Sequence, residues 1–187
     1  MSTIIGIDPG LKGGIAIFEN DKLLKVYKMP TLTKTTAFKH TKGKSKGQYR
    51  DQESIDTLAL VNILSAYDDP HVWLEKSIPL YGISLQNNLK IAYGAGQLHG
   101  VITALGVPFR EIMPKAWQEI TWINEDIVVR ENPNKRIKQS DTDTKATSLN
   151  SAERIFPGFN FILKGCKVPH DGCIDAALIA NYGRAQG

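Results

Sequence analysis

Four carboxylate side chains stand where the sequence predicts the end of a strand or the beginning of a helix. Asp8 and Glu75 each close a short apolar run, whereas Asp171 and Asp175 are four residues apart near the end of the chain. A spacing of four puts the latter two on one face of a helix. Carboxylates gathered in one place repel one another unless hard cations lie among them, and Mg²⁺ or Mn²⁺ with oxygen ligands meets that need. Two such ions can activate a water molecule and stabilise the leaving oxygen during phosphodiester cleavage.

Each acid taken alone has a plainer explanation. Asp8 precedes Pro9-Gly10 and could cap a turn, and Asp171 could compensate the dipole at a helix N-terminus. Asp175 fits a structural role less well, because it lies deeper in the helix beside the apolar residues 176–178. The case for chemistry therefore depends on whether the chain folds so that the four acids meet.

The first three strands are expected to form a meander. Residues 4–8 are apolar without alternation, which is typical of a strand buried on both faces. A glycine-rich turn at 10–14 leads to a second strand at 15–18, and Asn20-Asp21 turns the chain into a third strand at 23–29.

A crossover is expected to place the fourth strand beside the first. Apolar residues recur at helical spacing between positions 53 and 67, and Asp69-Pro70 ends that helix. A strand at 72–75 follows. A strand, a helix and a second strand can form a crossover connection, in which the strand at 72–75 lies parallel to the strand at 4–8 and beside it. Adjacent strands lie about 5 Å apart, which would bring Asp8 and Glu75 close enough to share a cation.

The rest of the chain supplies further helices and one more strand. Gly94, Gly96 and Gly100 in a long helix indicate the close approach of another backbone, which could be a helix of this chain, a second subunit or DNA. The expected elements are a loop at 77–88, helices at 89–105, from 114, at 145–156 and from 169, and a strand at 107–113.

Two polar segments, at about 30–52 and 124–143, interrupt the pattern. The second is expected to be irregular. The first is a low-complexity connection that we expect to be mobile, and from Lys34 to Arg50 it carries cations and no acid. Most charge runs are simply solvated, but lysines among Gly, Ser, Thr and Tyr also suit a flexible arm that follows a phosphate backbone. The lysines that would contact DNA are Lys39, Lys42, Lys44, Lys46 and, outside this segment, Lys115.

Composition bounds the class of protein. The 187 residues, of which 42% are hydrophobic, suit a single domain over residues 1–187 with a sizeable core. A net charge of +4 and a pI of about 9.0 favour an anionic partner. Cys166 and Cys173 are more typical of reduced thiols in a cytoplasmic protein than of a disulfide framework. No apolar run approaches the length of a membrane span, so no membrane partner is expected.

Three acidic motifs occur in an order that resembles a known family. They are I-I-G-I-D-P-G-L-K-G-G-I-A near the N-terminus, W-L-E-K in the middle and H-D-G-C-I-D-A-A-L-I-A at the end. Together they resemble the RuvC-type Holliday junction resolvases, particularly the compact phage-type branch. The segments P-K-A-W-Q, K-A-T-S-L and I-F-P-G are similar to the same branch, so the resemblance spans nearly the whole chain outside the two polar segments.

The resemblance implies an α/β protein with an RNase H-like fold, which is a five-stranded mixed sheet flanked by helices. It implies a metal-dependent endonuclease of DNA recombination and repair, acting in the cytoplasm of a bacterium or of a phage-infected host. Such an enzyme is a homodimer whose two sites cut opposite strands of a four-way junction symmetrically and leave ligatable nicks. The implied cofactor is Mg²⁺, for which Mn²⁺ can substitute, and the implied partner is branched DNA.

The resemblance also assigns roles to particular residues. It gives metal binding to the acids of the three motifs, Asp8, Glu75 and Asp175. Many members place the remaining ligand three residues before the final aspartate, where this chain has Gly172. Asp171, one residue further back, is expected to take that role, with His170 as the lesser candidate. Lys145 resembles the family's basic residue near the scissile phosphate, and Lys115 is the alternative.

Three other functions remain open at this stage. A nuclease of the same fold could prefer flaps, replication forks or other branched DNA. A DNA-structure binder without activity would need the acids only for packing, and the retention of all four makes this less favourable. An actin-like phosphotransferase also begins with an I-G-I-D-x-G strand and a glycine turn, but such enzymes need two domains of this kind and a longer chain.

Overall fold

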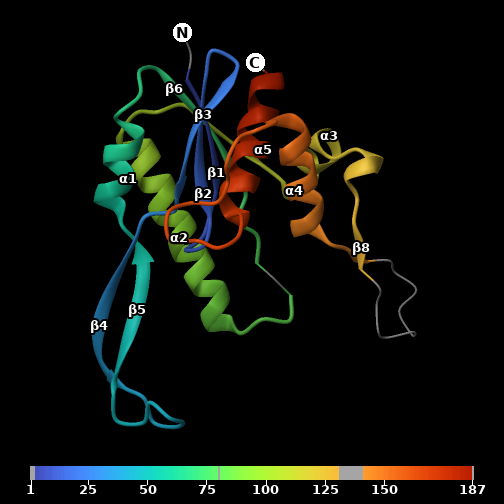
Figure 1. Ribbon diagram of the computed structural model, residues 1–187. Helices are drawn as coiled ribbons and strands as arrows, with labels where there is room; N and C mark the ends of the chain where they lie inside the picture. The colour runs from blue at the N-terminus through green and yellow to red at the C-terminus, as the bar shows by residue number, and fades with distance from the viewer. Residues whose placement is uncertain (1–2, 80, 131–140, 187) are drawn as a thin grey trace.

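A five-stranded mixed sheet forms the centre of the molecule, with the strand order β3-β2-β1-β6-β7 (Figure 1). The computed structural model describes residues 3–79, 81–130 and 141–186. The strands of the sheet are β1 (Thr3–Asp8), β2 (Gly14–Glu19), β3 (Lys22–Lys28), β6 (Pro70–Glu75) and β7 (Phe109–Ile112). Strand β1 is antiparallel to β2 and parallel to β6, which confirms the predicted mixed sheet.

Local sequence explains the meander and the crossover. Asn20 and Asp21 have φ angles of 51° and 62°, which suit a two-residue hairpin turn and join β2 to β3. Helix α1 (Thr57–Leu64) then carries the chain to β6. It begins later than position 53 because the Asp56 side chain caps it, accepting a hydrogen bond of 3.0 Å from the backbone N of Ala59.

Helices cover both faces of the sheet. Alternate side chains of β1 and β2 point to opposite faces, so Ile5 and Ile17 pack under α1 and α2, whereas Phe18 packs on the other side. The first face carries α1 and α2 (Leu85–Ala104). The second face carries α3 (Pro114–Thr121), α4 (Thr144–Ile155) and α5 (Asp171–Gln186).

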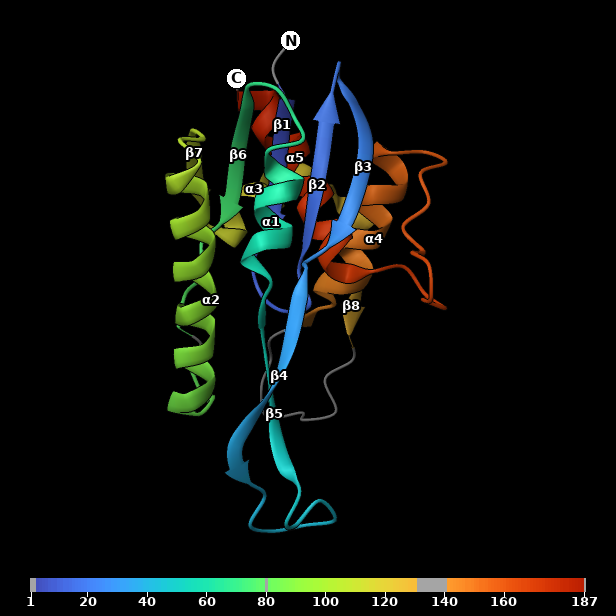
Figure 2. The same ribbon diagram turned by 90° about the vertical axis from the view of Figure 1, so that its left-hand side faces the viewer.

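The first polar segment is a β-hairpin, so the prediction of a low-complexity connection is wrong. Strands β4 (Thr31–Lys39) and β5 (Tyr49–Ile55) pair in antiparallel register and form a sheet of their own. Threonine has a high β-propensity, and it alternates with other residues at the start of β4. Both views show the hairpin extending beyond the end of the central sheet (Figures 1 and 2).

The second polar segment also contains local structure. A 3₁₀ turn (Asn124–Asp126) is followed by β8 (Val129–Arg130), which pairs with β9 (Asp141–Thr142). Residues 131–140 of this segment lie outside the described residues, as does position 80 of the loop before α2.

Helix α2 begins at Leu85, four residues earlier than predicted, because the Ser84 hydroxyl caps it. Its three glycines do not approach another backbone within the described part of the chain. A Cβ atom at Gly94 would meet only the Ile55 side chain, and at Gly96 or Gly100 it would meet nothing within 4 Å. Among the described helices, none is both long and apolar enough to cross a membrane.

Candidate active site

Helix α5 lies directly against the backbone of the central sheet. A Cβ atom on Gly6 of β1 would come within 2.1 Å of the carbonyl oxygen of Ala176, so only glycine allows this approach. The start of α5 is held in the same way, because Gly13 and Gly172 form a bridge between the glycine turn and the helix. These contacts place the first turns of α5 over the carboxyl end of β1, where Asp8 ends the strand.

The four acids named by the sequence meet at this end of the sheet. Ile7 pairs with Leu74, so Asp8 and Glu75 close neighbouring parallel strands. Burial raises the pKa of Asp8 well above its ordinary value, and the charges of Asp175, Glu75 and Asp171 raise it further. Each of these carboxylates is therefore close enough to Asp8 to act on its charge.

Asp175 is only partly compensated by its surroundings. Its pKa is raised to about 7, mainly by burial and also by the charges of Glu75 and Asp171. A hydrogen bond from Ser148 and the charge of Lys145 offset part of this effect. The Oδ1 atom of Asp175 is buried and has no hydrogen-bond partner among the described residues. An unpaired buried carboxylate oxygen is costly, and this atom could accept a cation.

The acids do not form a ready-made metal cage. Within residues 3–79, 81–130 and 141–186, no group of three or more His, Cys, Asp or Glu side chains could hold a metal ion as it stands. Besides Asp175, two of the acids have hydrogen-bond partners. The Nε1 atom of Trp117 donates to Glu75 Oε2 at 2.7 Å, and Lys145 Nζ donates to Asp171 Oδ2 at 2.5 Å.

The donor set nevertheless fits a hard cation. All four side chains offer carboxylate oxygens, which are the ligands that Mg²⁺ and Mn²⁺ prefer. The Lys145–Asp171 pair is exposed, with 67% and 48% of the two side chains accessible, so a cation can compete for Asp171 at little cost. Burial and the neighbouring carboxylates raise the pKa of Asp8 and Asp175, and a cation would compensate the charge of their ionised forms.

His170, Lys145 and Lys115, which the sequence named as further site residues, differ in where they lie relative to the four acids. His170 accepts a hydrogen bond at Nδ1 from the backbone N of Cys173 (3.3 Å), so it caps α5. Burial is the main reason why its pKa is lowered, and Lys28 lowers it further. Lys145 contacts the acids through Asp171. Lys115 lies on α3 beside a separate cavity of about 220 Å³, which is also lined by Gln118 and Trp122.

Two partners of the acids were not expected from the sequence. Trp117 is fully buried on α3, and its indole N–H donates a hydrogen bond to Glu75, from which it is separated by 42 positions in the sequence. Ser148 on α4 donates to Asp175. The tryptophan could have been suspected, because a buried indole N–H needs an acceptor, but the sequence does not say which one.

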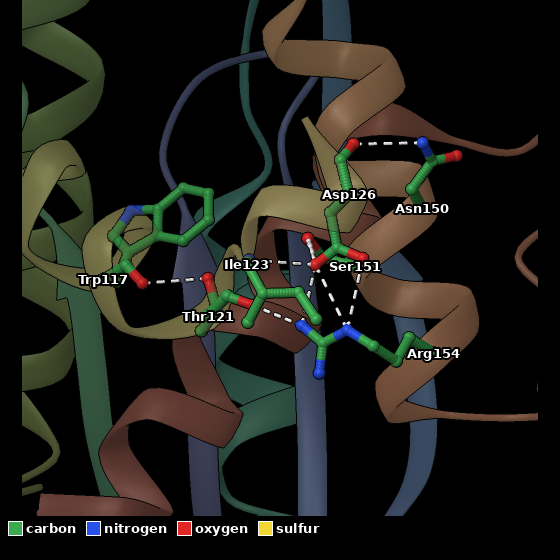
Figure 3. A network of polar contacts seen from close by, with 7 residues as sticks. All are labelled: Trp117, Thr121, Ile123, Asp126, Asn150, Ser151 and Arg154. Atoms are coloured by element: carbon green, nitrogen blue, oxygen red, sulfur yellow. Dashed lines mark hydrogen bonds and ion pairs between the residues drawn. The ribbon is translucent and has the colours of Figure 1, made fainter. Parts of the chain in front are cut away.

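A polar network joins the two helices that carry these partners (Figure 3). Asp126 is buried and accepts hydrogen bonds from the Arg154 guanidinium at 2.7 and 3.2 Å and from Ser151 Oγ at 2.8 Å. Arg154 also donates to the carbonyl of Thr121 at 2.7 Å, and Thr121 Oγ1 donates to the carbonyl of Trp117 at 2.8 Å. The network therefore fixes α4 relative to α3 behind the acid cluster.

The four hairpin lysines named as DNA contacts lie apart from the acids. Lys39 ends β4 and Lys42, Lys44 and Lys46 belong to the connection between β4 and β5, where all are exposed. The hairpin extends past the end of the sheet at which β1 and β6 finish (Figures 1 and 2). Its lysines are thus on the same side of the molecule as the acids but do not join the cluster.

Comparison with known proteins identifies the fold. No family model matches the sequence, and no curated protein matches it. The structure of Thermus thermophilus RuvC superposes with a TM-score of 0.50 at 14% identity, covering 98% of this chain and 96% of that one. A structure of T. thermophilus RuvC in complex with Holliday junction substrate gives a TM-score of 0.49 at 11% identity, covering 99% and 96%. The chain has the RNase H-like fold of RuvC.

Proposed function

We propose that this protein is a metal-dependent endonuclease that resolves four-way DNA junctions by paired, symmetric phosphodiester cleavage. One observation carries the proposal. Asp8, Glu75, Asp171 and Asp175 come from three separate parts of the chain and act on one another's charge at a single end of an RNase H-like sheet. A cluster that serves only packing would be expected to have its buried oxygens paired, and Asp175 Oδ1 is not.

Each residue has a role in this proposal. Asp8, Glu75, Asp171 and Asp175 would hold Mg²⁺ or Mn²⁺, which would supply an activated water and stabilise the leaving oxygen. Lys145 exchanges its contact with Asp171 for the scissile phosphate, to which a lysine brings a compact positive charge. Trp117 and Ser148 orient the carboxylates of Glu75 and Asp175, as hydrogen-bonded neighbours of metal ligands commonly do.

The two cuts require two sites, and α2 offers a surface for a second copy of the chain. Leu85, Leu89 and Tyr93 recur at spacings of four and are 74%, 59% and 61% exposed. Gly96 and Gly100 continue this stripe with open space above them. Lys90 is the one residue of the first half of α2 that carries a full charge, so the stripe suits the same helix of a second copy better than DNA.

Analytical ultracentrifugation tests the dimer. We expect the wild type to sediment as a dimer and Leu89→Glu to sediment as a monomer with an unchanged circular dichroism spectrum. A monomeric wild type would remove the homodimer from the proposal.

Cleavage of a synthetic four-way junction tests the function. Purified protein should cut the junction in Mg²⁺ and not in chelator, and the products should be two nicked duplexes whose nicks lie at symmetric positions and can be sealed by ligase. A supercoiled plasmid that extrudes a cruciform tests whether the two cuts are coupled. Coupled cuts convert the plasmid directly to linear DNA, and the nicked circular form does not accumulate.

The same substrates separate the alternatives. Flaps, replication forks and three-way junctions of the same sequence belong in the panel. Preferential cutting of one of these would keep the nuclease and change its substrate. Junction binding without cutting in either Mg²⁺ or Mn²⁺ would favour a DNA-structure binder and overturn the proposed activity.

A further inference from the structure

We propose that the tip of the β4–β5 hairpin binds the backbone of a duplex arm about eight base pairs from the cleavage site, and so sets a minimum arm length for tight binding. The inference rests on the proposed function, because it takes the acid cluster as the site of cutting. The inference extends the proposed function by assigning a second DNA contact, distant from the cut, to a part of the chain that is separate from the acids.

Positive charge is concentrated at the tip of the hairpin. Residues 39–50 contain Lys39, Lys42, Lys44, Lys46 and Arg50 and no acid. The stalk below them contains Lys34 together with Asp51 and Glu53. Thr35 Oγ1 donates to Asp51 and Thr31 Oγ1 donates to Glu53, both at 2.9 Å, so the acids are engaged within the stalk. An acid-free group of cations at the end of a ribbon is suited to a polyanion.

The hairpin is ordered enough to hold the tip at a distance. Backbone pairs run from Thr31–Ile55 to Thr35–Asp51 and resume at Lys39–Tyr49 after an irregularity. Beyond the last pair, the backbone N of His40 donates to Gln48 and that of Gly47 donates to His40, both at 2.9 Å. Lys39 Nζ lies 4.8 Å from the centre of the Tyr49 ring, which positions the first tip cation.

The base of the hairpin is anchored next to the acid cluster. The backbone N of Met29 donates to Gly13 at 3.0 Å, and Gly13 belongs to the turn that follows Asp8. On the other strand, the backbone N of Asp56 donates to Pro30 at 2.9 Å. From this base the hairpin runs away from the sheet past the end where β1 and β6 finish (Figures 1 and 2).

The length of the stalk sets the distance between the two contacts. Lys39 comes eight positions after Thr31, and a strand advances roughly 3.3 Å per residue, so the tip lies roughly 26 Å beyond the base. Phosphates along one DNA strand are spaced about 3.4 Å apart along the helix axis. A tip that follows a duplex would therefore meet phosphates about eight base pairs from the cut.

Binding of junctions with short and long arms tests this inference. The tip variant is Lys42→Ser with Lys44→Ser, and the matched control is Lys22→Ser with Lys25→Ser on β3 of the central sheet, which removes the same charge. For the wild type and the control, shortening all arms from 16 to 6 base pairs should raise Kd about tenfold or more at 0.1 M salt. The tip variant should bind both junctions with nearly the affinity that the wild type has for short arms.

Salt dependence and footprinting give a second readout. With long arms, the slope of log Kd against log salt should fall by about 1.8 in the tip variant, because each neutralised phosphate contributes about 0.9. Hydroxyl-radical protection centred about eight base pairs from the cut should disappear in the same variant and persist in the control.

The outcomes separate this inference from the proposed function. An equal dependence on arm length in wild type and tip variant, with an unchanged salt slope, would overturn the inference while cleavage continues. Absence of cleavage with every substrate would overturn the proposed function, yet tip-dependent protection of a duplex would still support the hairpin contact. Equal weak binding of all DNA by all three proteins would overturn both and point to an acidic protein as the hairpin's partner.

Discussion

Asp126 and Asp175 are both largely enclosed by protein on the same side of the sheet, and their surroundings differ in one respect. Asp126 receives hydrogen bonds from Arg154, Ser151 and the backbone N of Ile123. Although burial alone would raise its pKa, the bonds from Arg154 and Ser151 lower it overall. Asp175 receives a bond from Ser148, has one oxygen without a partner, and has a pKa raised to about 7.

The comparison separates a structural carboxylate from a functional one. The charge of Asp126 is satisfied inside the fold, so this residue stabilises the junction of α3 and α4 and needs no ligand. Burial and the charges of Glu75 and Asp171 disfavour the ionised form of Asp175, and a cation in the cluster would favour it. The supply of hydrogen-bond donors distinguishes the two sites.

The largest expected contrast is in cleavage. Asp175→Asn should reduce single-turnover cutting of a four-way junction on the order of 10³-fold, because it removes a ligand of the ions that stabilise the transition state. Asp8→Asn, Glu75→Gln and Asp171→Asn should behave alike, and all four should retain junction binding in a gel-shift assay. Asp126→Asn, assayed at a temperature at which it is folded, should cut within a few-fold of the wild type. Normal cutting by Asp171→Asn together with inactive His170→Ala would instead make His170 the fourth ligand.

The two carboxylates should also have opposite effects on metal-free stability. Asp126→Asn weakens the hydrogen bonds that Arg154 makes to a buried carboxylate, so the free energy of unfolding should fall by about 2 kcal/mol. Asp175→Asn relieves repulsion within the cluster, so its melting temperature in chelator should rise above that of the wild type. Urea unfolding and thermal melts in chelator measure both effects. Equal destabilisation by the two substitutions would show that Asp126 and Asp175 have the same structural role.

The dependence of stability on pH has a definite sign. The pKa of Asp175 is raised from its ordinary value to about 7, and that of Asp8 is raised as well, so the folded protein binds more protons than the unfolded chain between about pH 4 and 7. Stability gained by this protonation is present at low pH and is lost as the pH rises through 7. The metal-free protein should therefore melt at a lower temperature at pH 8 than at pH 5.5.

A matched variant isolates the acids as the cause of this slope. In Asp8→Asn with Asp175→Asn, the decrease in melting temperature between pH 5.5 and 8 should largely disappear. Saturating Mg²⁺ should also flatten it in the wild type, because the ion binds the deprotonated carboxylates. A wild-type protein whose metal-free melting temperature rose over the same range would contradict the raised pKa values.

The smallest expected effect concerns Trp117. Trp117→Phe keeps an aromatic ring in the core and removes the N–H that holds Glu75, so half-maximal cleavage should require about tenfold more Mg²⁺, with recovery at saturation. Trp122→Phe is the control, since its indole packs edge-on against Trp117 at 5.9 Å and its N–H has no partner among the described residues. Equal Mg²⁺ requirements in the two variants would show that Trp117 does not position Glu75.

Sequence reasoning succeeded where a local pattern determined the geometry. The crossover from β1 through α1 to β6 predicted that Asp8 and Glu75 would end neighbouring strands, and the register confirms it. The spacing of Asp171 and Asp175 predicted a shared helix, which α5 provides. The close backbone contacts of Gly6, Gly13 and Gly172 were not predicted from the sequence. They determine how closely α5 packs against the sheet.

The remaining features depend on tertiary contacts that no local pattern encodes. The hairpin was missed because its strands are polar on both faces and lack the apolar alternation by which a strand is recognised. Trp117 and Glu75 are 42 residues apart, and Asp126 and Arg154 are 28 apart. The packing of α3, α4 and α5 determines which acid receives hydrogen bonds from donors of the protein and which acid keeps an unpaired oxygen.

Binding of Mn²⁺ in the absence of DNA, followed by electron paramagnetic resonance, tests the central claim most directly. The account predicts that the wild type binds Mn²⁺, that Asp175→Asn lowers the affinity at least tenfold, and that Asp126→Asn leaves the affinity unchanged. Equal Mn²⁺ affinity in the wild type and Asp175→Asn, or a loss in Asp126→Asn as large as that in Asp175→Asn, would contradict it.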